Sequence, residues 1–135
     1  PWRVEDQFLV LMVKEVVPAE FGLSHMPASA DQFNEKMYKE CSAVTGEAIA
    51  RLKAKLPDNL VESKVCSGQI APEICFCARQ RKADMIVMGS NGRQGVQKFL
   101  LGSVAEEVLK KAPCSVEIIK SRAVGREKLK EAISQ

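Results

Sequence analysis

The residues best suited to chemistry in this 135-residue chain are a run of spaced glycines and a Gly-Ser pair. An apolar stretch leads into Gly89, Gly92 and Gly95, and Gly102 and Ser103 follow. Glycine permits positive φ and lets backbone N–H groups approach a ligand with no Cβ in the way. Loops of this kind cradle phosphate groups, and the free N–H groups at a helix N-terminus attract anions. The pattern therefore indicates an anion site, to which the Ser103 hydroxyl adds a hydrogen bond.

Two familiar phosphate-binding patterns are absent from the chain. The dinucleotide fingerprint Gly-x-Gly-x-x-Gly does not occur, and the Walker A pattern requires Gly-Lys where this chain has Leu101-Gly102. The spacing that is present is Gly-x2-Gly-x9-Gly-Ser. A structural alternative is that Gly89 and Gly92 only turn the chain and that Ser103 is an ordinary N-cap.

The other reactive side chains are less promising. Cys75 and Cys77 lie two apart in a predicted helix, so they point about 200° apart and do not share a metal ion. A thiol-redox protein that uses this pair is a minor alternative. The five cysteines form no regular framework and fit a reduced, cytoplasmic compartment. His25 is the only histidine, which argues against metal sites built on histidine.

Charge and length exclude several classes of protein. The 20 Lys and Arg residues outnumber the 17 Asp and Glu residues, and residues 120–135 carry the whole excess of +3. The neutral remainder argues against a nucleic-acid partner. No apolar run approaches the roughly 18–20 residues of a membrane span. We expect one domain at residues 1–119, followed by a basic tail at residues 120–135.

Predicted strands and helices alternate along the chain. The apolar runs Phe8–Val13 and Met85–Met88 predict strands that are buried on both faces, as in a parallel sheet. Val61–Cys66 predicts a shorter strand nearer an edge, and residues 116–119 predict a last strand. Helices are expected at residues 71–82 and 103–111, and a loose one at residues 124–133.

The longest predicted helix has an apolar stripe with steps of three and four residues. Its start is predicted at the Ser29–Gln32 capping box, with Asp31 as an alternative cap. The helix ends before Pro57. The stripe consists of Phe33, Met37, Cys41, Val44, Ala48 and Leu52.

The strict alternation predicts an α/β fold with one parallel sheet and helices on its faces. In such sheets ligands bind beyond the carboxyl ends of the strands. The glycine loop after Met88 lies at one such end.

Residues 84–119 resemble the universal stress protein family, specifically its ATP-binding subclass. The resemblance is carried by the Gly-x2-Gly-x9-Gly-Ser loop, by the strand before it and by Ala112-Pro113-Cys114 after it. It extends more weakly over about residues 8–119. It implies a Rossmann-like three-layer sandwich of the adenine-nucleotide alpha hydrolase-like type.

The resemblance also implies a function and a site. The loop of such proteins holds the triphosphate and ribose of ATP or AMP, and Mg²⁺ can accompany the triphosphate. Val13 resembles the residue beside the base. The residues that resemble phosphate- and ribose-contacting positions are Gly89, Asn91, Gly92, Gly102, Ser103 and Val104. A nucleotide-dependent regulator in stress response is therefore expected, as a homodimer paired through the strand Cys114–Ile119.

No residue is assigned to catalysis. Asp84 precedes a strand and Glu106 lies in the first turn of a helix, and both positions are usually structural. At most slow ATP hydrolysis is expected. The alternative function is an interaction module that works as a dimer in stress response without binding nucleotide.

The family pattern fails at the beginning of the chain. The family normally starts with a strand that carries an Asp near its end, followed by a long helix, and neither precedes Phe8. Asp6 lies before the Phe8 strand and does not replace the missing Asp. That first strand is usually central, so its loss exposes two strand edges. We expect either a fragment of a longer product or another chain or segment that fills the gap, together with reduced nucleotide affinity.

Overall fold

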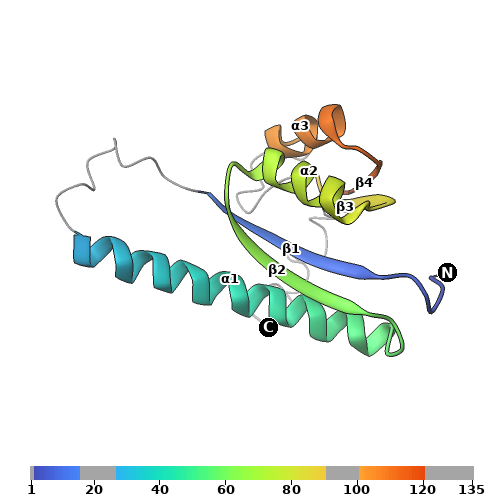
Figure 1. The fold of residues 1–135 in the computed structure, drawn as a ribbon, viewed down its shortest axis with the longest axis horizontal. Coiled ribbons are helices and arrows are strands. Elements are labelled where there is room, and N and C mark those ends of the chain that lie inside the picture. Colours follow the sequence, from blue (N-terminus) through green and yellow to red (C-terminus); the bar gives the residue numbers. More distant parts are fainter. Residues whose placement is uncertain (1, 16–26, 91–100, 121–135) are drawn as a thin grey trace, which may run out of the picture. The chain divides into compact units, whose positions relative to one another are not determined.

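The computed structural model describes residues 2–15, 27–90 and 101–120, with side chains omitted at residues 27–31. Strands and helices alternate in it as the sequence predicts (Figure 1). The elements are β1 (Phe8–Glu15), α1 (Pro27–Lys55), β2 (Val61–Gly68), α2 (Ile70–Arg81), β3 (Met85–Gly89), α3 (Ser103–Lys111) and β4 (Ser115–Ile119). The chain divides into two compact units, Pro1–Glu73 and Ile74–Gln135, which are described separately. The predicted helix at residues 124–133 lies outside the described residues.

The first unit contains a βαβ segment in which α1 connects two parallel strands. β1 and β2 pair from Phe8 with Val61 to Glu15 with Gly68. α1 lies alongside both strands (Figure 1). Exposed Glu62 and Lys64 give β2 the charged character of an edge strand, as predicted.

Helix α1 begins earlier than its sequence signals indicate. Its first residue is Pro27, so the predicted start at the Ser29–Gln32 capping box is wrong. Proline suits the first position of a helix because the N–H that it lacks has no partner within the helix there. The predicted end is confirmed, since α1 ends at Lys55 and Leu56 N–H still donates to the Leu52 carbonyl at 2.8 Å.

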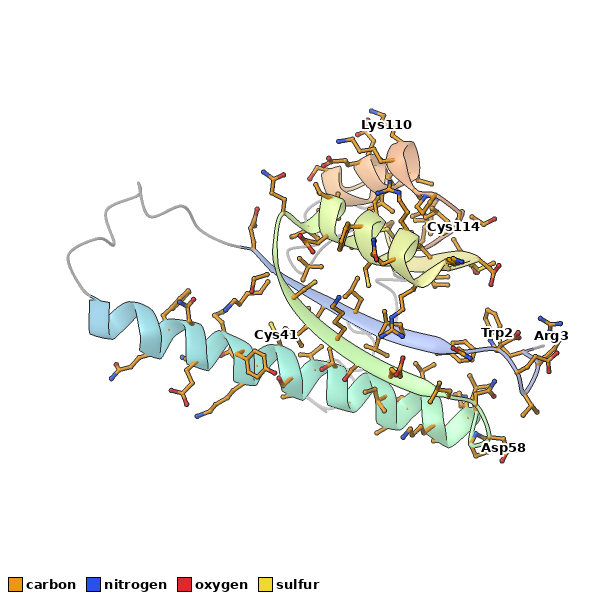
Figure 2. All side chains as sticks on the ribbon, viewed as in Figure 1. Trp2, Arg3, Cys41, Asp58, Lys110 and Cys114 are labelled. Atoms are coloured by element: carbon orange, nitrogen blue, oxygen red, sulfur yellow. The ribbon has the colours of Figure 1, made fainter. Side chains whose placement is uncertain are left out.

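The buried face of α1 is shifted from the predicted apolar stripe. Cys41 is buried as expected, on the side of α1 that faces the sheet (Figure 2), whereas Phe33 and Val44 are exposed. Thr45 is buried in place of Val44. Its hydroxyl donates to the Cys41 carbonyl at 3.1 Å, which removes the cost of burying an unpaired polar group.

A polar clamp fixes the start of β1 against the α1–β2 connection. Asn59 Nδ2 donates to the carbonyl oxygens of Arg3 (2.7 Å), Asp6 (2.8 Å) and Val4 (3.3 Å). The Arg3 N–H donates to the Asp6 carboxylate at 2.7 Å, and this bond lowers the pKa of Asp6. Trp2 and Arg3 lie together at this end of the chain (Figure 2). The clamp holds the turn from which β1 starts.

The second unit contains a parallel pair, β3 and β4, with α3 and most of α2. The strands pair from Met85 with Ser115 to Gly89 with Ile119. Val87 is 54% exposed and Met85 is 44% exposed, so the prediction that this strand is buried on both faces is wrong. In the described residues only one face of β3 is partly covered, and it carries Ile86 and Met88.

The strands pair in two separate sheets among the described residues, rather than in the single sheet that the sequence predicts. The orders are β1–β2 and β3–β4, and both pairs are parallel. Each pair follows the strand–helix–strand pattern, which is why the alternation identified the α/β class correctly. No described strand pairs with the second edge of β1 or of β3.

Candidate functional site

The candidate site lies where β3 ends and α3 begins. Ser90, the first residue after β3, donates its N–H to the Ile119 carbonyl at 3.0 Å. Its own carbonyl accepts the Gly102 N–H at 2.7 Å. The residues on either side of 91–100 are therefore joined directly, at the carboxyl ends of β3 and β4. This is the edge at which ligands of parallel α/β sheets bind.

The N-terminus of α3 is open to an acceptor from outside the helix. Gly102 is the N-cap, with no side-chain cap hydrogen bond, and its carbonyl accepts the Glu106 N–H at 2.9 Å. The N–H groups of Ser103 and Val104 precede that first bond, so helix geometry gives them no partner within the helix. The alternative that Ser103 is the N-cap is wrong, because Ser103 is the first helical residue. Its exposed position leaves the hydroxyl available at the surface.

Neither of the two described glycines of the motif, Gly89 and Gly102, has a positive φ. Gly102 has φ −64° and ψ 154°, which is an extended conformation that any residue adopts. Gly89 is the last residue of β3, and Gly68 is the one described glycine with positive φ. What glycine contributes at these two positions is the absence of a Cβ, which lets a ligand approach the backbone.

Two ion pairs neutralise the acidic residues near the start of α3. Lys110 Nζ lies 2.7 Å from Glu106 Oε1, and Lys111 Nζ lies 2.7 Å from Glu107 Oε1. The bond from Lys110 lowers the pKa of Glu106, and the bond to Glu107 raises the pKa of Lys111. These pairs reduce the repulsion that the two carboxylates would exert on an anion at the same helix end.

The structure brings together only part of the predicted site. Gly89, Gly102, Ser103 and Val104 lie at the junction of β3 and α3 in the second unit. Val13 lies in the first unit, where it is half-buried and pairs with Cys66. The predicted positions Asn91 and Gly92 lie outside the described residues.

Sequence reasoning missed the role of Ser90 and of Ile119. Ser90 is 8% exposed, and both residues act here through backbone groups. Residue types carry little signal for backbone hydrogen bonds. The one available signal is position, because Ser90 directly follows the predicted strand.

The other features considered are the cysteines, a metal site and a membrane span. All five cysteines are free, and Cys75 and Cys77 are both buried. Redox cysteines require access, so this burial argues against a thiol-redox function. The described residues contain no group of three or more His, Cys, Asp or Glu that would hold a metal ion. None of the described helices combines the length and the apolar character needed to cross a membrane.

Comparison with known proteins identifies the family. The sequence profile described as "Universal stress protein family" matches residues 10–120, which is most of the chain. The chain belongs to the universal stress protein family. This confirms the resemblance to the family that the glycine loop and its flanking strand and helix indicated.

Relatives of this universal stress protein occur in archaea. It is 45% identical over 60 residues to Universal stress protein MJ0531 of Methanocaldococcus jannaschii, a match that covers 44% of this chain and 35% of the relative. It is 25% identical over 111 residues to Universal stress protein MJ0577 of the same organism, with 81% and 68% covered. The chain therefore spans only part of the length of these relatives.

Solved structures confirm the predicted fold class. The structure of MJ0577 aligns with a TM-score of 0.63 at 24% identity, covering 87% of this chain and 78% of that one. Universal stress protein UspA from Lactobacillus plantarum aligns with a TM-score of 0.60 at 22% identity, covering 82% and 75%. The universal stress protein described here thus has the α/β, Rossmann-like fold with parallel strands that its sequence predicts.

Proposed function

We propose that this universal stress protein binds an adenine nucleotide, ATP or AMP, and acts in stress response as a nucleotide-dependent regulator. The observation that carries the proposal is the 2.7 Å hydrogen bond from Gly102 N–H to the Ser90 carbonyl. It joins the end of β3 to a helix N-terminus that has no side-chain cap. A phosphate group is the natural acceptor for such a helix end.

Each of the described residues of the candidate site has a role in the proposed complex. The N–H groups of Ser103 and Val104 and the Ser103 hydroxyl donate to phosphate oxygens, and the helix dipole adds a favourable field. Gly89 and Gly102 leave space for the ligand beside the backbone. By family resemblance, Asn91 and Gly92 contact phosphate and ribose, Val13 lies beside the adenine, and Mg²⁺ accompanies a triphosphate.

Glu106, the acidic residue in the first turn of α3, suits binding better than hydrolysis. Glu106 has a lowered pKa and is engaged with Lys110, so it is a weak proton acceptor. We therefore propose that the nucleotide acts as a signal and that hydrolysis is slow at most.

We also propose a homodimer that pairs through Cys114–Ile119. The Ile119 carbonyl faces β3, and backbone groups alternate along a parallel ladder. The N–H and C=O groups of Val116 and Ile118 therefore face the other edge of β4, where no described strand pairs. A second copy can add its own β4 there about a two-fold axis. This edge equally favours the alternative function, a dimeric interaction module without nucleotide. The five free thiols suit the cytosol.

Isothermal titration calorimetry with ATP and AMP in Mg²⁺ buffer tests the proposal. We expect saturable binding at sub-millimolar nucleotide. Gly102→Val should weaken ATP binding about tenfold, since it places a branched side chain beside N–H groups that donate to a charged ligand. The extended conformation of Gly102 admits valine without backbone strain, so folding should persist.

Gly46→Ala provides the matched control. Gly46 lies in α1, outside the motif, and a Cβ at this position meets nothing within 4 Å. Its ATP affinity should equal that of the unmodified chain. Absence of heat with the unmodified chain at sub-millimolar nucleotide would contradict nucleotide binding and favour the interaction module.

A further inference from the structure

Two backbone hydrogen bonds of Ser90 join β4 to α3. The N–H of Ser90 donates to Ile119, the last residue of β4, and the carbonyl of Ser90 accepts from Gly102, the N-cap of α3. The distances are 3.0 Å and 2.7 Å, and Ser90 is 8% exposed. A buried segment that is bonded at both ends transmits a displacement of one partner to the other.

The strand at the other end of this connection depends on its neighbours. β3 and β4 form a two-stranded sheet among the described residues, and isolated two-stranded sheets are marginally stable. The Ser90–Ile119 bond is the last rung of this ladder, next to the pair of Gly89 with Ile119. The stability of the Ser90–Ile119 hydrogen bond therefore affects how often the carboxyl end of β4 separates from β3.

We propose that Ser90 couples the ligand state of the α3 N-terminus to the carboxyl end of β4. This inference rests on the nucleotide site proposed above and names how that site is regulated. A phosphate held by Ser103 and Val104 fixes Gly102, which strengthens the Gly102–Ser90 bond. Both bonds hold the same residue, so a firmer hold on the Ser90 carbonyl also restricts the motion of its N–H relative to Ile119, and the Ser90–Ile119 bond opens less often.

The coupling works in both directions. A strand that pairs with the outer edge of β4 steadies Ile119 and, through Ser90, the helix end that receives the phosphate. Thermodynamic linkage requires that each event favour the other by the same factor. Nucleotide binding thereby favours pairing of a second copy at the outer edge of β4.

Hydrogen exchange in the absence of nucleotide tests the connection itself. Gly102→Pro removes the N–H that donates to Ser90, and the φ of −64° at Gly102 matches that of proline. Gly102→Ala keeps the N–H and is the matched control. We expect exchange of the Ser90 amide to be about fivefold faster in Gly102→Pro than in Gly102→Ala. Equal Ser90 exchange in the two variants would overturn the coupling.

Folding of the variants is checked within the same experiment. The Ala112 N–H donates to the Val108 carbonyl at 2.8 Å, at the far end of α3. Its exchange should be the same in Gly102→Pro and Gly102→Ala. If Ala112 loses its protection in Gly102→Pro, the coupling is tested instead by exchange of the Ser90 amide in the unmodified chain with and without ATP.

Addition of ATP to the unmodified chain separates the coupling from the nucleotide proposal. Bound ATP should slow exchange of the Ser90 amide about fivefold. Calorimetric binding without a change at Ser90 contradicts the coupling alone. Absence of calorimetric binding contradicts the nucleotide proposal. The connection through Ser90 is then tested by the comparison of Gly102→Pro with Gly102→Ala in the absence of nucleotide.

Discussion

The clamp made by Asn59 gives a prediction whose size follows from the structure. Asn59→Ala removes an amide whose two N–H donors are shared among the carbonyls of Arg3, Val4 and Asp6. The first two bonds are exposed, so water replaces them at small cost, whereas the bond to Asp6 is partly buried. At about 0.5–1.5 kcal/mol for a typical hydrogen bond, the free energy of unfolding should fall by about 1–2 kcal/mol.

Urea denaturation followed by circular dichroism measures this loss. Asp58→Ala is the matched control, because Asp58 precedes Asn59 in the same connection and is exposed (Figure 2). Its effect should stay within about 0.5 kcal/mol. Exchange of the Phe8 amide, which donates to the Leu60 carbonyl at 2.9 Å, should quicken in Asn59→Ala alone. Equal stability of the two variants would refute the reasoning that Asn59 holds the start of β1.

Two further predictions concern α3. Val108 is fully buried and Leu109 is 46% exposed, so Val108→Ala should lower the free energy of unfolding by about 2–3 kcal/mol, and Leu109→Ala by much less. Urea denaturation measures both, and similar losses would contradict the burial of Val108. Lys110→Met should raise the pKa of Glu106 toward 4.5, as followed by NMR titration, because the hydrogen bond from Lys110 is the largest cause of its lowering. Since the pKa of Glu106 is depressed in the folded state, the stabilisation from this pair is present above pH 4.5 and is lost as the pH falls through the folded value. An unchanged Glu106 titration in Lys110→Met would show that the pair does not form in solution.

Local signals predicted α3 better than α1. The predicted residues 103–111 coincide with α3, because Gly102 and Ser103 mark the start and two lysines with Pro113 mark the end. At α1 the polar residues after Pro27 suggest a later start. Their capping preference is overridden because the helix continues upstream to a proline that suits its first position.

Burial was harder to predict than secondary structure. An apolar stripe predicts which side of a helix is buried, but a neighbouring position can replace one of its members. Thr45 is buried in place of Val44 because the helix itself supplies an acceptor for its hydroxyl. In β3 an apolar run suggests burial on both faces, but burial also requires covering elements, and Val87 has none among the described residues.

The candidate site was predictable where it depends on residue types. The glycine spacing and the Gly-Ser pair located Gly89, Gly102, Ser103 and Val104 correctly at a strand end and a helix start. The physical reason given for the two glycines was only half correct, because Gly102 has an ordinary φ. The connection through Ser90 was not predictable, since it is made by backbone groups that every residue except proline carries.

The proposed function requires that the N-terminus of α3 receive the phosphate groups of an adenine nucleotide. Titration of ATP into the ¹⁵N-labelled chain, followed by amide chemical shifts, tests it most directly. We expect saturable shifts at the Ser103 and Val104 amides, with little change at Ala112 at the far end of α3. Shifts that leave Ser103 and Val104 unchanged at saturating ATP would contradict it.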